Sequence, residues 1–252
     1  MGKEFDDLAE AYERTATDDM PFRQYIEAHT FLAALGDITG KHVLDLGCGS
    51  GLYTRRLHNL GAAKVTGIDN SDGMIDYVRR REAADRLGLT YLRREATHPA
   101  QSDPELDGQF DLVASVYVLC YAPTTQALAG FCTTARRALR PTGGRFVFAT
   151  LNPDVATQPG YYTHYGFDFD MADTSQDGAE APMRAWIPAR EFRLTPYRWS
   201  RRAYEQALHQ AGFTTVSWIH PRVSPEGLAA YGGAHWANYL KIPHALVVDC
   251  TA

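Results

Sequence analysis

A glycine-rich turn between residues 47 and 51 constrains this chain more than any other feature. An apolar run over 43–46 precedes Gly47, Gly49 and Gly51, and predicts a buried strand that passes through a tight turn into a helix. Glycine has no side chain, so a ligand can lie directly against the backbone of the turn. The first N–H groups of the following helix also lack partners within that helix. The turn therefore predicts a binding site for a small ligand.

A second apolar segment, 64–69, ends in a carboxylate. Asp69 lies 22 residues after Gly47, a spacing typical of a βαβ unit whose second strand presents an acid to a ribose diol. The glycines follow G-x-G-x-G, whereas dinucleotide-binding enzymes favour G-x-G-x-x-G. Asp45 lies two residues before the first glycine, which is too early to reach a ribose. It can accept a hydrogen bond from an N–H or ammonium group near the turn.

These motifs resemble the first motif of the class I S-adenosylmethionine (SAM) methyltransferases. The resemblance implies SAM as cofactor, with Asp45 and the glycines at its methionine end and Asp69 at its ribose. It covers 41–150 by motif and 199–252 by topology. Further cofactor contacts implied by it are Tyr12, Cys48, Asn70, Met74, Glu95, Ala96, Thr97, Ser115 and Val116.

Alternatives remain for several of these residues. Met74 can stack on adenine or simply pack inside its helix. The segment 95–97 can bracket the adenine or form a surface loop, and the family often has Asp where Glu95 or Ala96 stands. Cys48 suits the turn as a small side chain better than as a reactive thiol.

The alternation of segments predicts an α/β fold with a parallel sheet and helices on both faces. The resemblance implies that this sheet is the Rossmann-like, seven-stranded sheet of class I methyltransferases. Strands are predicted at 42–46, 64–69, 90–93, 110–116, 145–150, 213–219 and 245–249. Helices are predicted at 25–35, 51–60, 73–87, 123–139 and 200–211. We expect an N-terminal helical cap over 1–40, a SAM-binding core over 41–150, a substrate lid over 151–198 and a C-terminal completion of the sheet over 199–252.

The lid is the segment richest in aromatic residues, with nine in the 39 residues from 161 to 199. A strand-rich insertion is expected after the fifth strand, with a hairpin of 166–171 against 182–187. Aromatic walls suit a flat substrate and tolerate a sulfonium cation, although a small core under a lid would have the same composition. Candidate substrate contacts are Tyr117, Tyr121, Tyr161, Tyr162, Tyr165, Phe167, Trp186 and Trp236.

Methyl transfer from SAM is an in-line displacement, and alignment alone can supply roughly 7–11 kcal/mol. A base is needed only when the nucleophile keeps its proton until late. Candidates are His98, His164 and His220, with Tyr117 as a hydrogen-bonding partner, although a lone histidine is more often structural. No His, Asp and Glu set in the sequence has metal-ligand spacing.

Bulk properties limit the partners. The net charge is −5 and the basic runs are short, which disfavours nucleic acid. No run approaches 18 apolar residues and the N-terminus lacks an apolar signal core, so we expect a cytoplasmic protein away from membranes. Four scattered cysteines fit a reducing compartment. The sequence leaves monomer and homodimer open.

The residues at the end of the predicted fourth strand bear on the class of substrate. DNA amino-methyltransferases carry Asp/Asn-Pro-Pro-aromatic there, whereas this chain has Ser-Val-Tyr-Val at 115–118. Segments 161–167 and 224–240 resemble bacterial small-molecule enzymes that include the N-methyltransferase of toxoflavin (azapteridine) biosynthesis. The sequence thus predicts methyl transfer to N or O of a small, flat heteroaromatic or phenolic acceptor in natural-product metabolism. A SAM-binding sensor and a nicotinamide oxidoreductase are the alternatives.

Overall fold

The computed structural model describes residues 13, 20–98, 102–171, 176–187 and 190–252. Its main sheet consists of β1 (His42–Leu46), β2 (Lys64–Asp69), β3 (Thr90–Arg93), β4 (Leu112–Val116), β5 (Arg145–Leu151), β11 (Thr215–Ile219) and β12 (Ala245–Thr251). The strand order is β11-β12-β5-β4-β1-β2-β3. Strands β1 to β5 are parallel, and β12 lies antiparallel between β5 and β11. The predicted seven-stranded sheet is confirmed, with its closing hairpin inserted as expected.

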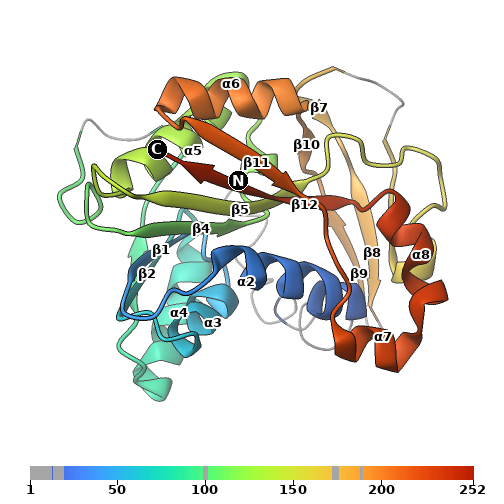
Figure 1. Cartoon of the computed structure of the whole chain (residues 1–252), viewed down its shortest axis with the longest axis horizontal. Coiled ribbons are helices and arrows are strands. Elements are labelled where there is room, and N and C mark those ends of the chain that lie inside the picture. The colour runs from blue at the N-terminus through green and yellow to red at the C-terminus, as the bar shows by residue number, and fades with distance from the viewer. Residues whose placement is uncertain (1–12, 14–19, 99–101, 172–175, 188–189) are drawn as a thin grey trace.

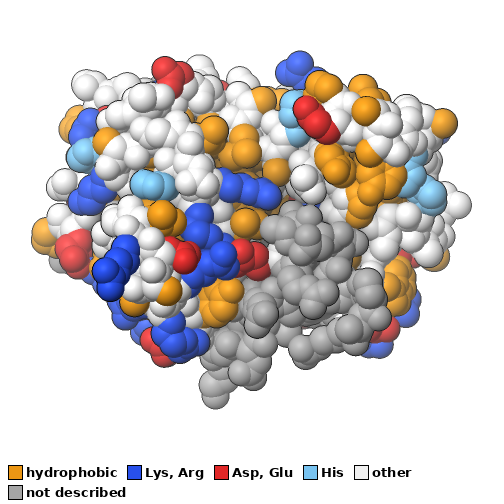
Figure 2. All heavy atoms as spheres, turned by 90° about the horizontal axis from the view of Figure 1, so that it is seen from below, with side chains coloured by type: hydrophobic (Ala, Val, Ile, Leu, Met, Phe, Trp, Pro, Cys, Tyr) orange, Lys and Arg blue, Asp and Glu red, His pale blue; other side chains and the backbone are white. Residues whose placement is uncertain are grey.

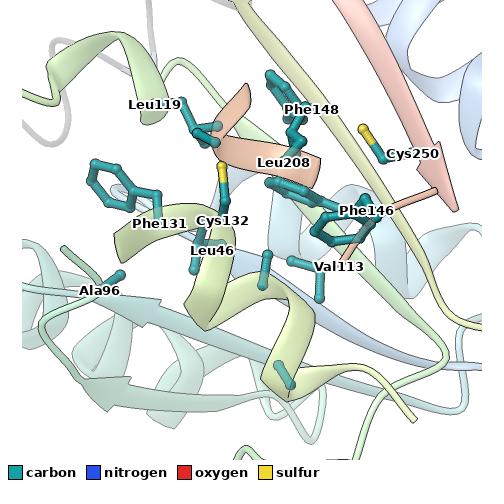
Figure 3. Close-up of a cluster of buried hydrophobic side chains, with 14 of the residues drawn as sticks. Leu46, Ala96, Val113, Leu119, Phe131, Cys132, Phe146, Phe148, Leu208 and Cys250 are labelled. Atoms are coloured by element: carbon teal, nitrogen blue, oxygen red, sulfur yellow. The ribbon is translucent and has the colours of Figure 1, made fainter. Parts of the chain in front are cut away.

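Helices cover both faces of this sheet (Figure 1). One face carries α2 (His29–Leu35), α3 (Leu52–Asn59) and α4 (Asp72–Asp85), and the other carries α5 (Thr125–Ala138) and α6 (Arg201–Ala211). Figure 3 shows the second layer, where Phe131 and Cys132 of α5 and Leu208 of α6 pack with Phe146 and Phe148 of β5. Burial on both faces explains why the central strands are almost wholly apolar.

Local sequence sets the ends of these helices. Ser71, Thr124 and Ser200 each precede a helix and accept a hydrogen bond from a backbone N–H three residues on. Gly212 ends α6 with φ +100°, a conformation that glycine adopts without steric cost. The predicted helix over 25–35 differs in one respect, because its first part is a π-helix, η3 (Arg23–Ala28), that continues into α2.

The lid forms its own small sheets beside the main one (Figure 1). One contains β6 (Phe167–Phe169), β8 (Met183–Ile187) and β9 (Arg190–Leu194), and the other contains β7 (Ala179–Glu180) and β10 (Tyr197–Arg198). The predicted hairpin is confirmed, with Phe167 opposite Ala185. Two helices that the sequence analysis missed, α7 (Pro225–Tyr231) and α8 (Gly233–Lys241), pack against the lid. Short 3₁₀ turns lie at η4 (Leu119–Tyr121) and η5 (Thr163–Tyr165).

The surface shows no single-sign field over the described part of the chain that Figure 2 displays. Acidic and basic side chains lie next to one another there. Among the described residues, Arg81 forms a salt bridge with Asp85, and Arg93 forms one with Asp72. Within the described residues, no helix combines the length and the apolar character that a bilayer crossing requires. Exposed large hydrophobic side chains include Leu228, Tyr231 and Leu240 on α7 and α8.

Candidate functional site

A cleft of about 1010 Å³ opens at the carboxyl ends of β1, β2 and β4. We call it the strand-end cleft. Ligands of open parallel sheets bind at this edge, where loops follow the strands. Ten of the residues predicted to contact the cofactor line it: Asp45, Gly47, Cys48, Gly49, Asp69, Asn70, Met74, Glu95, Ala96 and Val116.

The glycine turn is held against β2 by its own backbone. The N–H groups of Gly47 and Cys48 both donate to the Ile68 carbonyl, at 2.8 and 2.9 Å, and the Gly49 N–H donates to Asp69 Oδ2 at 2.9 Å. These three N–H groups are therefore not free to bind a ligand. Their donors are consumed because they fix the turn to the neighbouring strand.

The glycines instead provide space. Gly47 and Gly49 have φ of +72° and +50°, in the left-handed region that favours glycine. A Cβ at Gly47 would lie 2.2 Å from Cγ2 of Val118, so packing excludes a side chain there. A Cβ at Gly49 would meet nothing within 4 Å, so this position faces open space in the cleft. A ligand can approach the backbone at Gly49.

Two carboxylates flank the turn. Asp45 is buried and accepts a hydrogen bond from Thr54 Oγ1 at 2.6 Å. Burial raises its pKa to about 7, the Thr54 hydrogen bond opposes the shift, and the nearby charge of Asp69 adds to it. Asp69 accepts from the backbone of Ser71 and Gly49, and burial raises its pKa as well. A positive ligand group beside Asp45 would relieve this cost by favouring the charged form.

The loop after β3 forms a polar rim. Glu95 accepts from the Thr97 N–H and hydroxyl with one oxygen, and from Asn70 Nδ2 at 3.0 Å with the other. Thr97 thus orients Glu95 and does not itself line the cleft. Ser115 and Gly51 likewise lie behind the surface: the Ser115 hydroxyl donates to the Leu46 carbonyl, and Gly51 caps α3. Tyr12 lies outside the described residues.

A second pocket of about 690 Å³ adjoins the strand-end cleft, and Arg23, Tyr117 and Tyr121 line both. We call it the aromatic pocket. Its apolar wall comes from the N-terminal segment, the lid and the end of β5, and includes Phe22, Cys120, Leu151, Phe167, Phe169 and Met183. The side chains with polar groups that line it include Arg23, Glu27, Tyr117, Tyr121 and His244.

The other predicted substrate aromatics lie elsewhere. Tyr162 and Trp236 are fully buried, and their polar atoms donate to the carbonyls of Ile242 and Gly227. Tyr165 is buried and hydrogen-bonds the α8 backbone, and Tyr161 donates to the Asn238 carbonyl. Trp186 is 39% exposed, beside Arg184. Four of these side chains join the lid to α8, so their aromatic composition reflects a core rather than a pocket surface.

The histidine predictions need a similar correction. His98, His164 and His220 are exposed and line neither the strand-end cleft nor the aromatic pocket. His164 contacts His235 at 2.9 Å on the surface of the lid, and His98 contacts the Thr97 hydroxyl. These positions follow from polar loops and strand ends that face solvent. Of the predicted acid–base group, only Tyr117 lies in the pockets.

Sequence reasoning missed Arg23, Glu27 and His244. The available signal was an Arg and a Glu four residues apart on the apolar side of a helix, beside the buried Ile26. Charged residues are almost never fully buried unless they are paired with an opposite charge. His244 offered a weaker signal, because it immediately precedes four consecutive buried residues at the start of β12. Within the described residues, no group of three or more His, Cys, Asp or Glu is arranged to hold a metal.

Comparisons with known proteins agree with this geometry. Residues 43–143 match a family model described as "Methyltransferase domain". The chain has the class I methyltransferase fold. Among solved structures, an S-adenosylmethionine-dependent methyltransferase from Mesorhizobium loti is 24% identical (TM-score 0.62; 90% of this chain and 97% of that one). The CcbJ methyltransferase from Streptomyces caelestis is 21% identical (TM-score 0.66; 99% and 97%).

The curated relatives match only about half of this chain. A ubiquinone biosynthesis O-methyltransferase from Nitrosococcus oceani is 33% identical over 136 residues, which are 54% of this chain and 52% of that protein. The chain thus spans about half the length of the curated relatives it matches. The methyltransferase-domain match over 43–143 contains nearly all residues that line the strand-end cleft, whereas most of the aromatic pocket comes from segments outside that match.

Proposed function

We propose that this chain is a SAM-dependent methyltransferase. One observation carries the proposal: a cleft at the carboxyl ends of parallel strands has a bare turn at Gly49 between two carboxylates, the buried Asp45 and the half-buried Asp69. Asp45 would bind the ammonium group of SAM and Asp69 its ribose hydroxyls. The methyltransferase-domain match over 43–143 supports the same cofactor. SAM supplies a methyl carbon activated by a positively charged sulfur.

The acceptor proposed here is a small, flat heteroaromatic or phenolic compound that is methylated at N or O. The aromatic pocket supports this, because Phe22, Phe167 and Phe169 provide flat apolar walls in a pocket that adjoins the strand-end cleft. Such an acceptor fits natural-product metabolism, as in the toxoflavin-type enzymes that segments 161–167 and 224–240 resemble. We further propose that the enzyme acts in the cytoplasm as a monomer or homodimer.

Calorimetric titration with SAM tests the cofactor, with NAD as the comparison ligand. We expect saturable heat with SAM and none with NAD. Mass spectrometry of reactions with a panel of phenols and nitrogen heterocycles then tests the transfer, through a gain of one methyl group. Tight SAM binding without turnover on any acceptor would favour a SAM-binding sensor, and the absence of heat with SAM would refute the proposal.

A further inference from the structure

Glu27 is a buried carboxylate that the cofactor site does not use. It lies in the π-helix η3 and is 6% exposed, in a pocket whose walls are mostly apolar. Burial raises its pKa, although Arg23 and the Tyr117 hydrogen bond oppose the shift. Placing a carboxylate in such surroundings costs stability, and π-helical turns are frequent at functional sites. Its position therefore calls for a function.

The two oxygens of Glu27 have different surroundings. Oε1 accepts a short hydrogen bond from the Tyr117 hydroxyl and lies 3.2 Å from His244 Nε2. Among the described residues, Oε2 accepts no hydrogen bond of good geometry and is paired with the Arg23 guanidinium through a long ion pair, with Nε at 3.5 Å. A carboxylate oxygen buried without a hydrogen-bond donor is costly. Glu27 lines the aromatic pocket, so a ligand bound there can supply the missing donor.

The neighbouring groups hold Glu27 in place. His244 contacts the Tyr117 hydroxyl at 3.1 Å and the Tyr239 hydroxyl at 2.9 Å, and burial lowers its pKa to about 3, so its ring is neutral. Hydroxyls rotate and a neutral imidazole has two tautomers, so this chain of contacts can be satisfied with Glu27 charged or protonated. The network therefore keeps Oε1 paired whether Glu27 is charged or protonated.

The backbone of Tyr117 has an unusual conformation. Its φ is +57°, in the left-handed region that bulky side chains rarely adopt. Strained conformations of this kind concentrate at functional sites, where the surrounding structure over-determines them. Tyr117 follows β4 directly and lines both the strand-end cleft and the aromatic pocket. Its strained backbone conformation therefore places its hydroxyl against Glu27, where the two pockets adjoin.

We propose that Glu27 takes the proton from the substrate that is methylated. This substrate binds in the aromatic pocket and presents an N–H or O–H group to Glu27 Oε2. This inference rests on the proposed function. In the step, the acceptor atom attacks the methyl carbon, the new N–C or O–C bond forms, and the C–S bond breaks with its electron pair going to sulfur. The N–H or O–H proton passes to Oε2. Tyr117 and His244 are positioning residues.

The proposed role of Glu27 limits the chemical class of the substrate that is methylated. It is a planar ring whose nucleophilic atom carries a hydrogen, such as a ring N–H or a phenol, because a fully substituted amine would leave Oε2 without a donor. Arg23 lies beside Oε2 and over the Tyr117 ring, so the pocket also suits an acceptor that carries electron-rich atoms next to its donor.

Matched probe pairs test donor recognition: benzimidazole against 1-methylbenzimidazole, and 2-naphthol against 2-methoxynaphthalene. Each is titrated into the protein saturated with S-adenosylhomocysteine. We expect a donor probe to bind wild type about tenfold more tightly than its methylated partner. Glu27→Leu should reduce this ratio to within twofold, and the exposed Glu226→Gln should leave it unchanged. Equal binding of both members, or binding of neither, would overturn the inference.

The pH dependence separates a titrating carboxylate from a structural one. The charged or titratable groups that face Glu27 are Arg23, Tyr117, His244 and Tyr239. Burial raises the pKa of both tyrosines and keeps His244 neutral, so Glu27, whose pKa burial also raises, is the group here that gains a proton as the pH falls. Donor-probe affinity should fall in wild type as the pH decreases and Glu27 becomes protonated. Glu27→Gln should show no such fall, and an identical pH profile in both proteins would contradict the inference.

The two proposals can fail separately. If wild type does not bind S-adenosylhomocysteine, the proposed function fails first. If it binds while the probes show no preference for a donor, only the role of Glu27 fails. With any donor probe that wild type methylates, we expect Glu27→Gln to lower kcat about 100-fold, with the KM for SAM unchanged within twofold. An unchanged kcat would contradict proton transfer to Glu27.

Discussion

The strand-end cleft and the aromatic pocket adjoin each other but are built in different ways. Most of the strand-end cleft comes from segments that directly follow β1, β2, β3 and β4, and its glycine turn is fixed by backbone hydrogen bonds to β2. The aromatic pocket combines side chains from η3, η4, the lid and the start of β12. The first site therefore depends on the sheet itself, whereas the second can change through the segments added around it.

This difference agrees with what relatives share. The methyltransferase-domain match covers 43–143 and contains nearly the whole strand-end cleft. Most of the residues that line the aromatic pocket fall before or after it, including Glu27 and His244. A common core with variable additions can serve many acceptors. Substitutions in the two regions should accordingly affect different properties.

The largest effect is expected for Trp236→Ala in the core that joins the lid to α8. Trp236 is 1% exposed and its indole donates to the Gly227 carbonyl. Removing it should lower the free energy of unfolding by about 3–5 kcal/mol, measured by urea denaturation. Trp186→Ala, at a side chain 39% exposed, is the control and should stay within about 0.5 kcal/mol of wild type. Equal losses in both variants would show that the division between core and surface is wrong.

Gly49→Val should come next, with a loss of SAM affinity of roughly 100-fold or more. The valine would occupy the open space at the turn and would strain a backbone with φ +50°. Gly88→Val is the matched control, because Gly88 also has positive φ but is exposed and distant in sequence from the turn. Calorimetry with SAM compares the two. Wild-type affinity in Gly49→Val would place the cofactor elsewhere.

Asp69→Ala should weaken SAM binding by about 1–3 kcal/mol, since ribose hydroxyls would lose their acceptor. The same change also removes the partner of the Gly49 N–H. Asp76→Ala on the exposed side of α4 tests whether charge alone matters, and should bind SAM like wild type. Similar affinities for both variants in calorimetry would argue against a role of Asp69 at the ribose.

The smallest effect is a pH dependence at Asp45. Its pKa is raised to about 7, so the carboxylate is charged above that pH and becomes neutral below it. The charged form binds an ammonium group, and with a pKa of about 7 the charged fraction falls from one half to roughly one tenth, so SAM affinity should fall by about fivefold from pH 7 to pH 6. Asp45→Asn should bind more weakly at pH 8 and show a flat profile over the same range. A wild-type profile that is equally flat would contradict this assignment.

Sequence patterns predicted the sheet and the strand-end cleft well because both depend on local signals. The apolar run over 43–46, the glycines after it and the acid at Asp69 lie in one βαβ unit, and the backbone rules for such units are strict. The lid hairpin was also found, from its aromatic alternation and its flanking glycine and proline.

The aromatic pocket was mostly beyond prediction. Glu27, Tyr117 and His244 are separated by 90 and 127 residues and meet only after the lid, η3 and β12 assemble. Composition could not tell whether an aromatic residue such as Tyr162 lines a pocket or fills a core, because both need apolar rings. The helices α7 and α8 were not predicted, because each is short, α7 begins at Pro225 and α8 follows Gly232.

A crystal structure of the chain with S-adenosylhomocysteine would test the central claim most directly. The account predicts the ligand in the strand-end cleft, against the backbone at Gly49, with its amino group on Asp45 and its ribose on Asp69. Density for the nucleoside at another location, with the turn at 47–51 covered by neighbouring side chains, would contradict it.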